Sequence, residues 1–493
     1  MNNAEKKNER VLVFGLDGAP YELISSWLES GYLPFLQKLK KEGAYGPLEV
    51  SVPTISLLEW PVFYTGKNPA KLGLFGLGQV KDPKENTPLT LANTQLIEGP
   101  TLWELLNKGG ISVGVMNIPA TYPPVPVQGF LIAGMLSPSS SQFYYPKNLK
   151  SYLREYRIGI EAEQFGELPD KLIDKSGLLE ELYDIHTKRV KTILTLLEAF
   201  PVDFFIVNFK ELDELQHLFW DSKKTLLDFY QTVDKSMEWI VAQFRPTHTF
   251  VISDHGFHHA EREYFFVNRW LEEKGFLERT PSGKLYALVH PILSQFFKGK
   301  VRELIPARFK TREKLTSLAG GMINFHRTKA YANVWGVYLS DIIKDNEEYT
   351  KYKKLLRKEL ESARNPHNGE KIFKKVYARE EIYAGKYLHK FPEFITLPNP
   401  NYLPNPVLSN KLFEPRVDKP YLEGAHKSAT EAILFTSGEK IKKGCHLEGV
   451  NILDLAPTIL HLYGLEPTPE MDGTIIRKML IDKQVNLQKK STT

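Results

Sequence analysis

Short runs of Val, Ile and Phe alternate along the first half of the chain with longer stretches whose apolar residues recur at helical spacing. Runs of this length, bounded by turn residues, predict buried β-strands, and the longer stretches predict amphipathic helices. Alternation of the two is typical of an α/β protein with a mostly parallel sheet and helices on both faces. The predicted strands cover residues 10–15, 111–117, 130–135, 203–209 and 247–253, and the predicted helices cover 21–42, 178–200 and 224–244.

The hydrophobic pattern loosens after about residue 270. Residues 386–420 are rich in Pro and Asn and have no clear period, which indicates an insertion or cap over the core. Strand and helix patterns then return at 431–436 and 451–465. We therefore expect one core formed by residues 8–265 and 420–480, with a cap region inserted at 266–419.

The composition is that of an ordinary globular protein, with 42% hydrophobic and 25% charged residues among 493. The net charge of +5 argues against a dedicated nucleic-acid-binding module, and the basic stretch at 294–318 is expected to be an exposed helix face. The single cysteine, Cys445, excludes an internal disulfide and a thiolate zinc site. No apolar run approaches the ~20 residues of a transmembrane segment, and the polar start lacks the pattern of a signal peptide, so we expect a cytoplasmic protein.

Aspartates stand just after the ends of three predicted strands, at Asp17, Asp213 and Asp254. The carboxyl ends of parallel strands meet at one edge of a sheet, where α/β proteins bind their ligands. A single aspartate at such a position is more often a helix N-cap. The recurrence at three strand ends favours a shared site over three unrelated caps.

Histidines accompany these aspartates at spacings that suit metal binding. His217 lies four residues after Asp213, which on a helix points both side chains the same way, and His255 directly follows Asp254. His426 precedes a further predicted strand. Asp and His ligands together favour Zn, Mn or Fe over Ca or Mg. The alternative for each pair alone is a surface hydrogen bond.

Ser56 directly precedes a predicted helix at 57–64. The N–H groups and the dipole at a helix N-terminus favour an anion, so the Ser56 hydroxyl could attack a phosphate bound there. The alternative is that Ser56 only caps the helix, which is the more common role of an isolated serine at this position.

These residues belong to a longer ordered series of motifs: Asp17-Gly18, Pro53 and Ser56 leading to Thr65-Gly66-Lys67-Asn68-Pro69, Asn117 to Pro124, Asp213 with His217, Ser253-Asp254-His255-Gly256, Gly424-Ala425-His426, Asp454 to Thr458, and Met471-Asp472-Gly473. As a set they resemble the alkaline phosphatase superfamily, and most closely its type I phosphodiesterase/nucleotide pyrophosphatase family. The resemblance runs from about residue 10 to about residue 475. It implies an alkaline-phosphatase-like, mostly parallel sheet with helices on both faces and an inserted cap.

The resemblance also implies that two divalent metal ions and a hydroxyl nucleophile act on a small phosphorylated substrate. The family nucleophile is a Thr or Ser nine residues before a Thr-Gly pair, which here is Ser56 before Thr65, with Thr54 as the alternative. Zn is the first choice of metal and Mn the second. One ion would be held by Asp17, Ser56, Asp254 and His255, and the other by Asp213, His217 and His426.

The activity that the resemblance implies is hydrolysis of a phosphodiester or phosphoanhydride bond. Leu77 stands twenty-one residues after Ser56, where nucleotide pyrophosphatases often have an Asn that binds a phosphate oxygen, so nucleotide specificity is not implied. Two alternatives stay open: a phosphomonoesterase or phosphotransferase of the same superfamily, and a catalytically silent protein that binds a phosphorylated ligand. The leaving group, the native metal and the oligomeric state are also left open.

Overall fold

The computed structural model describes residues 9–79, 90–138, 141–160, 174–285, 322–417, 421–427 and 431–481. The chain forms two compact units. Unit 1 comprises Met1–Leu77, Ala92–His259 and Pro420–Thr493, and unit 2 comprises Gly78–Leu91 and Ala260–Lys419. Unit 2 thus includes the segment 78–91, which the hydrophobic pattern had not separated from the core. The basic stretch predicted as an exposed face, 294–318, lies outside the described residues.

Unit 1 is built on a sheet whose described strands follow the order β20-β2-β19-β9-β1-β8-β5-β6-β7, with β21 beside β2. The five central strands are parallel, which confirms the predicted mostly parallel α/β sheet. They are β9 (His248–Ile252), β1 (Val11–Leu16), β8 (Phe204–Phe209), β5 (Val113–Ile118) and β6 (Gly129–Ala133). The flanking strands are β19 (Ala432–Gly438), β2 (Gly43–Glu49), β20 (Cys445–His446), β21 (Val450–Asn451) and β7 (Tyr144–Tyr145).

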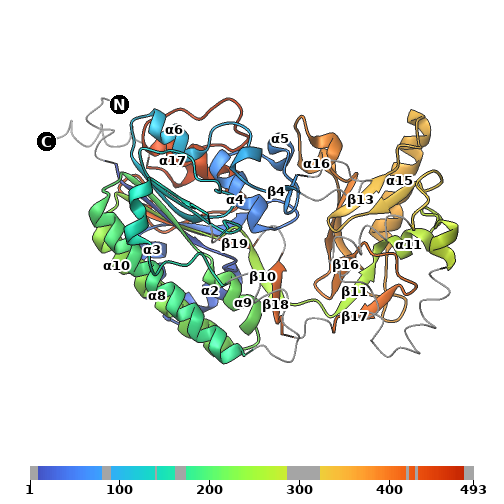
Figure 1. The fold of residues 1–493 in the computed structure, drawn as a ribbon, viewed down its shortest axis with the longest axis horizontal. Helices are drawn as coiled ribbons and strands as arrows, with labels where there is room; N and C mark the ends of the chain where they lie inside the picture. Colours follow the sequence, from blue (N-terminus) through green and yellow to red (C-terminus); the bar gives the residue numbers. More distant parts are fainter. Residues whose placement is uncertain are drawn as a thin grey trace, which may run out of the picture. The chain divides into compact units, whose positions relative to one another are not determined.

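Helices cover both faces of this sheet (Figure 1). Every residue of β1 and β8 is buried, as expected for parallel strands packed on both sides. On one face, apolar side chains of the helices form a single core with strand residues such as Phe14 and Phe205. The helices of that face are α2 (Tyr21–Glu29), α3 (Pro34–Glu42), α8 (Lys175–Ala199), α9 (Glu211–Phe219) and α10 (Lys223–Phe244). The other face carries α4 (Ser56–Thr65), α6 (Leu102–Lys108) and α17 (Leu455–Leu462), and α5 (Pro69–Leu72) follows α4 along the chain.

The single helix predicted at 21–42 is wrong, because the chain forms two helices there. α2 ends at Glu29, and Gly31 after it adopts a left-handed conformation with φ of 74° that ends helices readily. α3 then begins at Pro34, whose ring lacks the N–H needed to continue a preceding helix. Both helices bury their apolar face in the same core, so the apolar spacing alone did not reveal the break.

The buried carboxylate of Asp234 in α10 caps the N-terminus of α3. Its oxygens accept hydrogen bonds from the backbone N–H groups of Phe35 (2.9 Å) and Leu36 (3.0 Å). Asp234→Ala leaves both buried donors without this acceptor, so we expect the free energy of unfolding to fall by about 2 kcal/mol. Urea denaturation followed by circular dichroism measures the change. Asp228→Ala is the control, because Asp228 belongs to the same helix and its side chain is 45% exposed. Equal losses in the two variants would contradict the prediction.

Unit 2 has its own hydrophobic core and, in its described residues, three small sheets. The stretch 386–420 has no clear hydrophobic period, yet its described part contributes the strands β15, β16 and β17. The first sheet has the order β12 (Ala330–Ala332), β13 (Gly336–Leu339), β15 (Phe394–Pro398) and β14 (Phe373–Ala378). The second has the order β16 (Tyr402–Asn405), β11 (Glu263–Phe266) and β17 (Phe413–Pro415). The third sheet is the pair of β3 (Gly78–Gln79) and β4 (Thr90–Leu91). The helices of unit 2 include α11 (Val267–Glu273), α15 (Asn346–Ser362) and α16 (Arg379–Ile382).

A two-stranded ribbon joins the two halves of unit 1 that are separate in the sequence. β10 (Gly256–His259) follows β9, and it pairs antiparallel with β18 (Gly424–Lys427), where the chain re-enters unit 1. Phe257 lies opposite His426 in this register. The ribbon therefore places His426, from the C-terminal part of the chain, at the edge of the sheet where β9 ends.

Within the described residues, no helix combines the length and the apolar character needed to cross a membrane.

Candidate metal centre and nucleophile

The strand order brings the predicted aspartates to one edge of the sheet. β9, β1 and β8 are neighbours, and each is followed by one of the acidic residues. Asp17 follows β1, Asp254 follows β9, and α9 after β8 carries Asp213. All three carboxylates are buried, with exposed fractions of 6% or less. None of them serves as the side-chain cap of a helix, because α2, α9 and the other described helices are capped by other residues or by none.

Ser56 is the first residue of α4, and Ile55 occupies the N-cap position. The Ser56 hydroxyl does not cap the helix. It donates a hydrogen bond to Asp17 Oδ1 over 3.2 Å and lies 3.1 Å from His255 Nε2. The side chain therefore turns away from its own helix toward the acidic edge of the sheet.

The seven predicted donors meet in one cluster, in which two groups have ligand atoms within 4.8 Å of one another. The first group is Asp213, His217 and His426, as the resemblance implied. The second is Asp17, Asp213 and His255, so Asp213 belongs to both. Asp254 Oδ2 lies 3.4 Å from His255 Nε2, and its Oδ1 accepts a hydrogen bond from the Gly18 N–H.

The Nδ1 atom of each of the three histidines forms a hydrogen bond with a backbone carbonyl oxygen. A carbonyl can only accept, so each Nδ1 carries the proton and each Nε2 presents a lone pair to the cluster. This is the orientation that metal-ligating histidines usually have. The pairs are His217 with Gly424 (2.9 Å), His426 with Thr54 (3.1 Å) and His255 with Gly256 (3.2 Å).

Burial and charge set the protonation of the cluster. Burial lowers the pKa of His217 and of His255 to about 4, so both rings are neutral near pH 7. Burial, followed by the charges of Asp254 and Asp213, raises the pKa of Asp17 well above its usual range. Burial opposes ionisation of Asp213 as well, but Lys210 and the neighbouring histidines outweigh it and hold the pKa of Asp213 well below its usual range.

Two polar residues of the cluster were not predicted from the sequence. Asn208, in β8, donates a hydrogen bond to Asp17 Oδ2 over 2.6 Å. Gly15 makes room for it, because a Cβ at Gly15 would lie 2.8 Å from Asn208 Oδ1 and 2.3 Å from the Trp60 ring. Lys210, between β8 and α9, contacts the Asp213 carboxylate. The only sequence signal for either residue was its place at the end of a strand.

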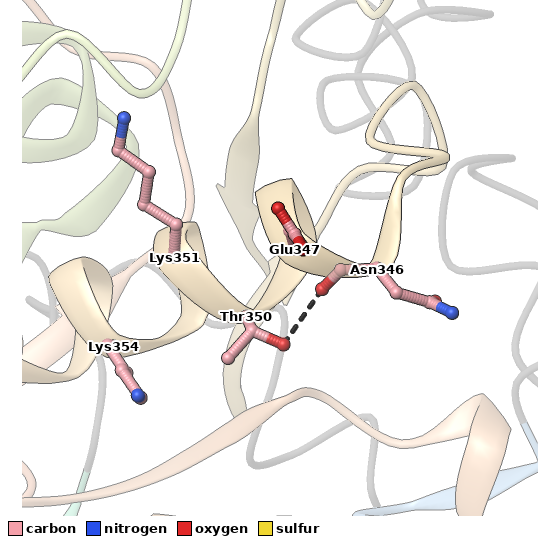
Figure 2. Close-up of a pocket in the computed structure, with 5 residues that line it drawn as sticks. All are labelled: Asn346, Glu347, Thr350, Lys351 and Lys354. Carbon is pink, nitrogen blue, oxygen red and sulfur yellow. Dashed lines mark hydrogen bonds between the residues drawn. The ribbon is translucent and has the colours of Figure 1, made fainter.

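A separate hollow of about 530 Å³ lies on unit 2 (Figure 2). The residues that line it all belong to α15, and the one hydrogen bond drawn among them is the helical contact from Thr350 Oγ1 to Asn346 O. They bring together no histidine and no buried acid, so we assign no chemistry to this hollow. The lining residues are Asn346, Glu347, Thr350, Lys351 and Lys354.

The chain is similar to known proteins in sequence pattern and in fold. The family model described as type I phosphodiesterase / nucleotide pyrophosphatase matches residues 11–428. No curated protein matches the sequence. Similar solved structures include murine ectonucleotide pyrophosphatase/phosphodiesterase 5, at 15% identity and a TM-score of 0.55, and an inactive form of it in complex with AMP, at 14% and 0.55. The human protein of the same name has 13% identity and a TM-score of 0.53, and each comparison covers 96% of this chain and 100% of the other. At these identities the likeness shows a shared fold.

Proposed function

The chain belongs to the type I phosphodiesterase / nucleotide pyrophosphatase family and is a hydrolase of that type, and we propose that it cleaves phosphodiester or phosphoanhydride bonds with Ser56 as nucleophile and two bound divalent metal ions. The proposal assigns one ion to Asp17, Ser56, Asp254 and His255. It assigns the other to Asp213, His217 and His426.

The observation that carries the proposal is the convergence of unprotonated ring nitrogens on one point. His217 Nε2 and His426 Nε2 lie 3.2 Å apart, and His426 Nε2 lies 3.1 Å from Asp213 Oδ1. Because both Nδ1 atoms carry the protons, these three atoms are all acceptors and repel one another unless a cation lies among them. Burial opposes protonation of His426, but the hydrogen bond to Asp213 outweighs it and raises the pKa of His426, so positive charge is favoured among these atoms.

The donor set also fits divalent transition metals in number and kind. Two His nitrogens and one Asp oxygen form a three-ligand set that is common for catalytic zinc, with a position left for substrate. Asp254 Oδ2 is buried and accepts no hydrogen bond from the described residues, as expected of an oxygen reserved for a metal. Two dications bound here would supply positive charge that acidifies a hydroxyl and stabilises the entering and leaving oxygens of an in-line displacement.

The protein's own groups prepare Ser56 for attack. Its hydrogen bond to Asp17 Oδ1 fixes the direction of the hydroxyl. The N–H groups of Leu58 and Glu59 donate to Ile55 O, which leaves those of Ser56 and Leu57, at the start of α4, to hold phosphoryl oxygens. Attack by Ser56 Oγ forms the new bond to phosphorus, and the leaving group departs with the electron pair of its own oxygen. The Ser56-linked intermediate still carries the other group of the substrate, and water then attacks its phosphorus, releases the phosphomonoester product and restores the Ser56 hydroxyl.

We expect diesters to be cleaved faster than monoesters. No arginine among the described residues contacts Ser56 or Asp17 to neutralise a dianionic phosphoryl group. The measurement is a parallel assay of a diester, a monoester and a nucleotide pyrophosphate with purified protein and added Zn or Mn. Faster turnover of the monoester would move the protein to the phosphomonoesterase alternative. No turnover of any of the three, with metal bound, would favour the silent ligand-binding alternative.

A further inference from the structure

Lys210 reaches the cluster from the turn between β8 and α9, and its side chain is only 12% exposed. Its Nζ lies 3.2 Å from Asp213 Oδ2 and 3.4 Å from Glu214 Oε1. Glu214 Oε2 accepts a hydrogen bond from the Ile160 N–H, so Glu214 is fixed at both oxygens. Lys210 thus occupies one oxygen of each of two neighbouring carboxylates.

The two oxygens of Asp213 are divided between different partners. Oδ1 faces His426 Nε2 at 3.1 Å and His217 Nε2 at 3.4 Å, whereas Oδ2 is bound by the ammonium of Lys210. Asp213 is also the residue shared by both donor groups. A carboxylate with two available oxygens can chelate one ion or bridge two, and the contact with Lys210 opposes both modes.

We propose that Lys210 is a positioning residue that limits Asp213 to a single donor oxygen and thereby makes the site prefer Zn over Mn, an inference that rests on the proposed two-metal function. Zn binds well to a small set of N and O ligands in tetrahedral geometry. Mn prefers more ligands, most of them oxygen. Loss of Lys210 makes Asp213 Oδ2 available as an additional oxygen donor, which favours Mn relative to Zn.

The test compares the affinities of metal-free full-length protein for Zn and for Mn, measured by competition with a chelator. Removal of a positive charge strengthens binding of both dications to a similar extent, so the charge effect cancels in the ratio of the two affinities. In Lys210→Met and Lys210→Gln we expect the Zn/Mn affinity ratio to fall about 10- to 100-fold. Lys210→Arg keeps the cation and is expected to stay close to the wild-type ratio.

Lys440→Met is the matched control. Lys440 is also a partly buried lysine, paired with Glu9 at 2.5 Å, but it lies beside the opposite ends of β1 and β9. The Zn/Mn affinity ratio of Lys440→Met should equal that of the wild type. An unchanged Zn/Mn affinity ratio in Lys210→Gln overturns the inference. If the KM of that variant is raised while the ratio is unchanged, Lys210 contacts the substrate and does not set the metal preference. A wild-type protein that binds neither ion overturns the proposed function itself, so the two failures are distinguishable.

Discussion

Replacement of Ser56 by alanine is expected to lower kcat about 10³-fold or more while the fold survives. The Ser56 hydroxyl contacts both Asp17 Oδ1 (3.2 Å) and His255 Nε2 (3.1 Å) from the first residue of α4. The substitution removes the attacking oxygen and one metal donor together. Steady-state kinetics with a diester substrate measures the loss, and circular dichroism of the same sample checks the fold.

Thr54→Ala is the matched control for this variant, because Thr54 is the alternative nucleophile in the same loop. The backbone carbonyl of Thr54 accepts the hydrogen bond from His426 Nδ1, and that carbonyl is kept in the alanine variant. We therefore expect Thr54→Ala to retain most of the wild-type turnover. Near-full turnover of Ser56→Ala, or trapped phosphate mapped to Thr54, would falsify the assignment of the nucleophile.

The second large effect is expected for His426→Ala, which should lose one bound ion and all measurable hydrolysis. His426 Nε2 lies 3.1 Å from Asp213 Oδ1 and 3.2 Å from His217 Nε2, so its removal leaves two protein ligands for that ion. Elemental analysis of protein dialysed after loading with Zn should show one equivalent less than the wild type. Chelation of the wild type should abolish hydrolysis, and added Zn or Mn should restore it.

His259→Ala is the control for the histidine variant. His259 lies on the same ribbon in β10, but its side chain is 70% exposed and pairs with Asp221. The variant should keep both its metal content and its rate. A His426→Ala protein that retains two ions and full activity would show that the second ion is not bound where we propose.

The central strands could be predicted because strands covered on both faces appear in the sequence as uninterrupted apolar runs. β2 was missed because its sequence contains Gly43, Gly46 and Pro47, which are typical of turns. Glycine is needed at positions 43 and 46 because neighbouring backbone lies too close to leave room for a Cβ. A Cβ at Gly43 would lie 1.8 Å from Thr436 O, and one at Gly46 would lie 2.1 Å from Leu447 O. Those neighbours come from the far end of the chain, so no local pattern reveals them.

The candidate donors could be found because neighbouring parallel strands end at the same edge, and the structure brings all seven together. Their roles in metal binding and catalysis stay predictions. Asn208 and Lys210 could not be found in this way. The contact between Asn208 and Asp17 joins residues 191 positions apart, and an asparagine at a strand end has many other uses. A lysine at a helix start is usually solvated, and only the burial of Lys210 against Asp213 distinguishes it.

The ribbon of β10 and β18 gives the inserted segment a particular freedom to change during evolution. Its ends, His259 and Gly424, are paired residues of one antiparallel ladder, so the intervening chain is a long loop closed at strand spacing. The entropic cost of closing such a loop grows by only about 0.6 kcal/mol for each doubling of its length. Large insertions, deletions or exchanges between these two points can therefore accumulate at small cost to the core. The ladder keeps His426 opposite Phe257 throughout, so the inserted segment can be exchanged without rebuilding the candidate metal ligands.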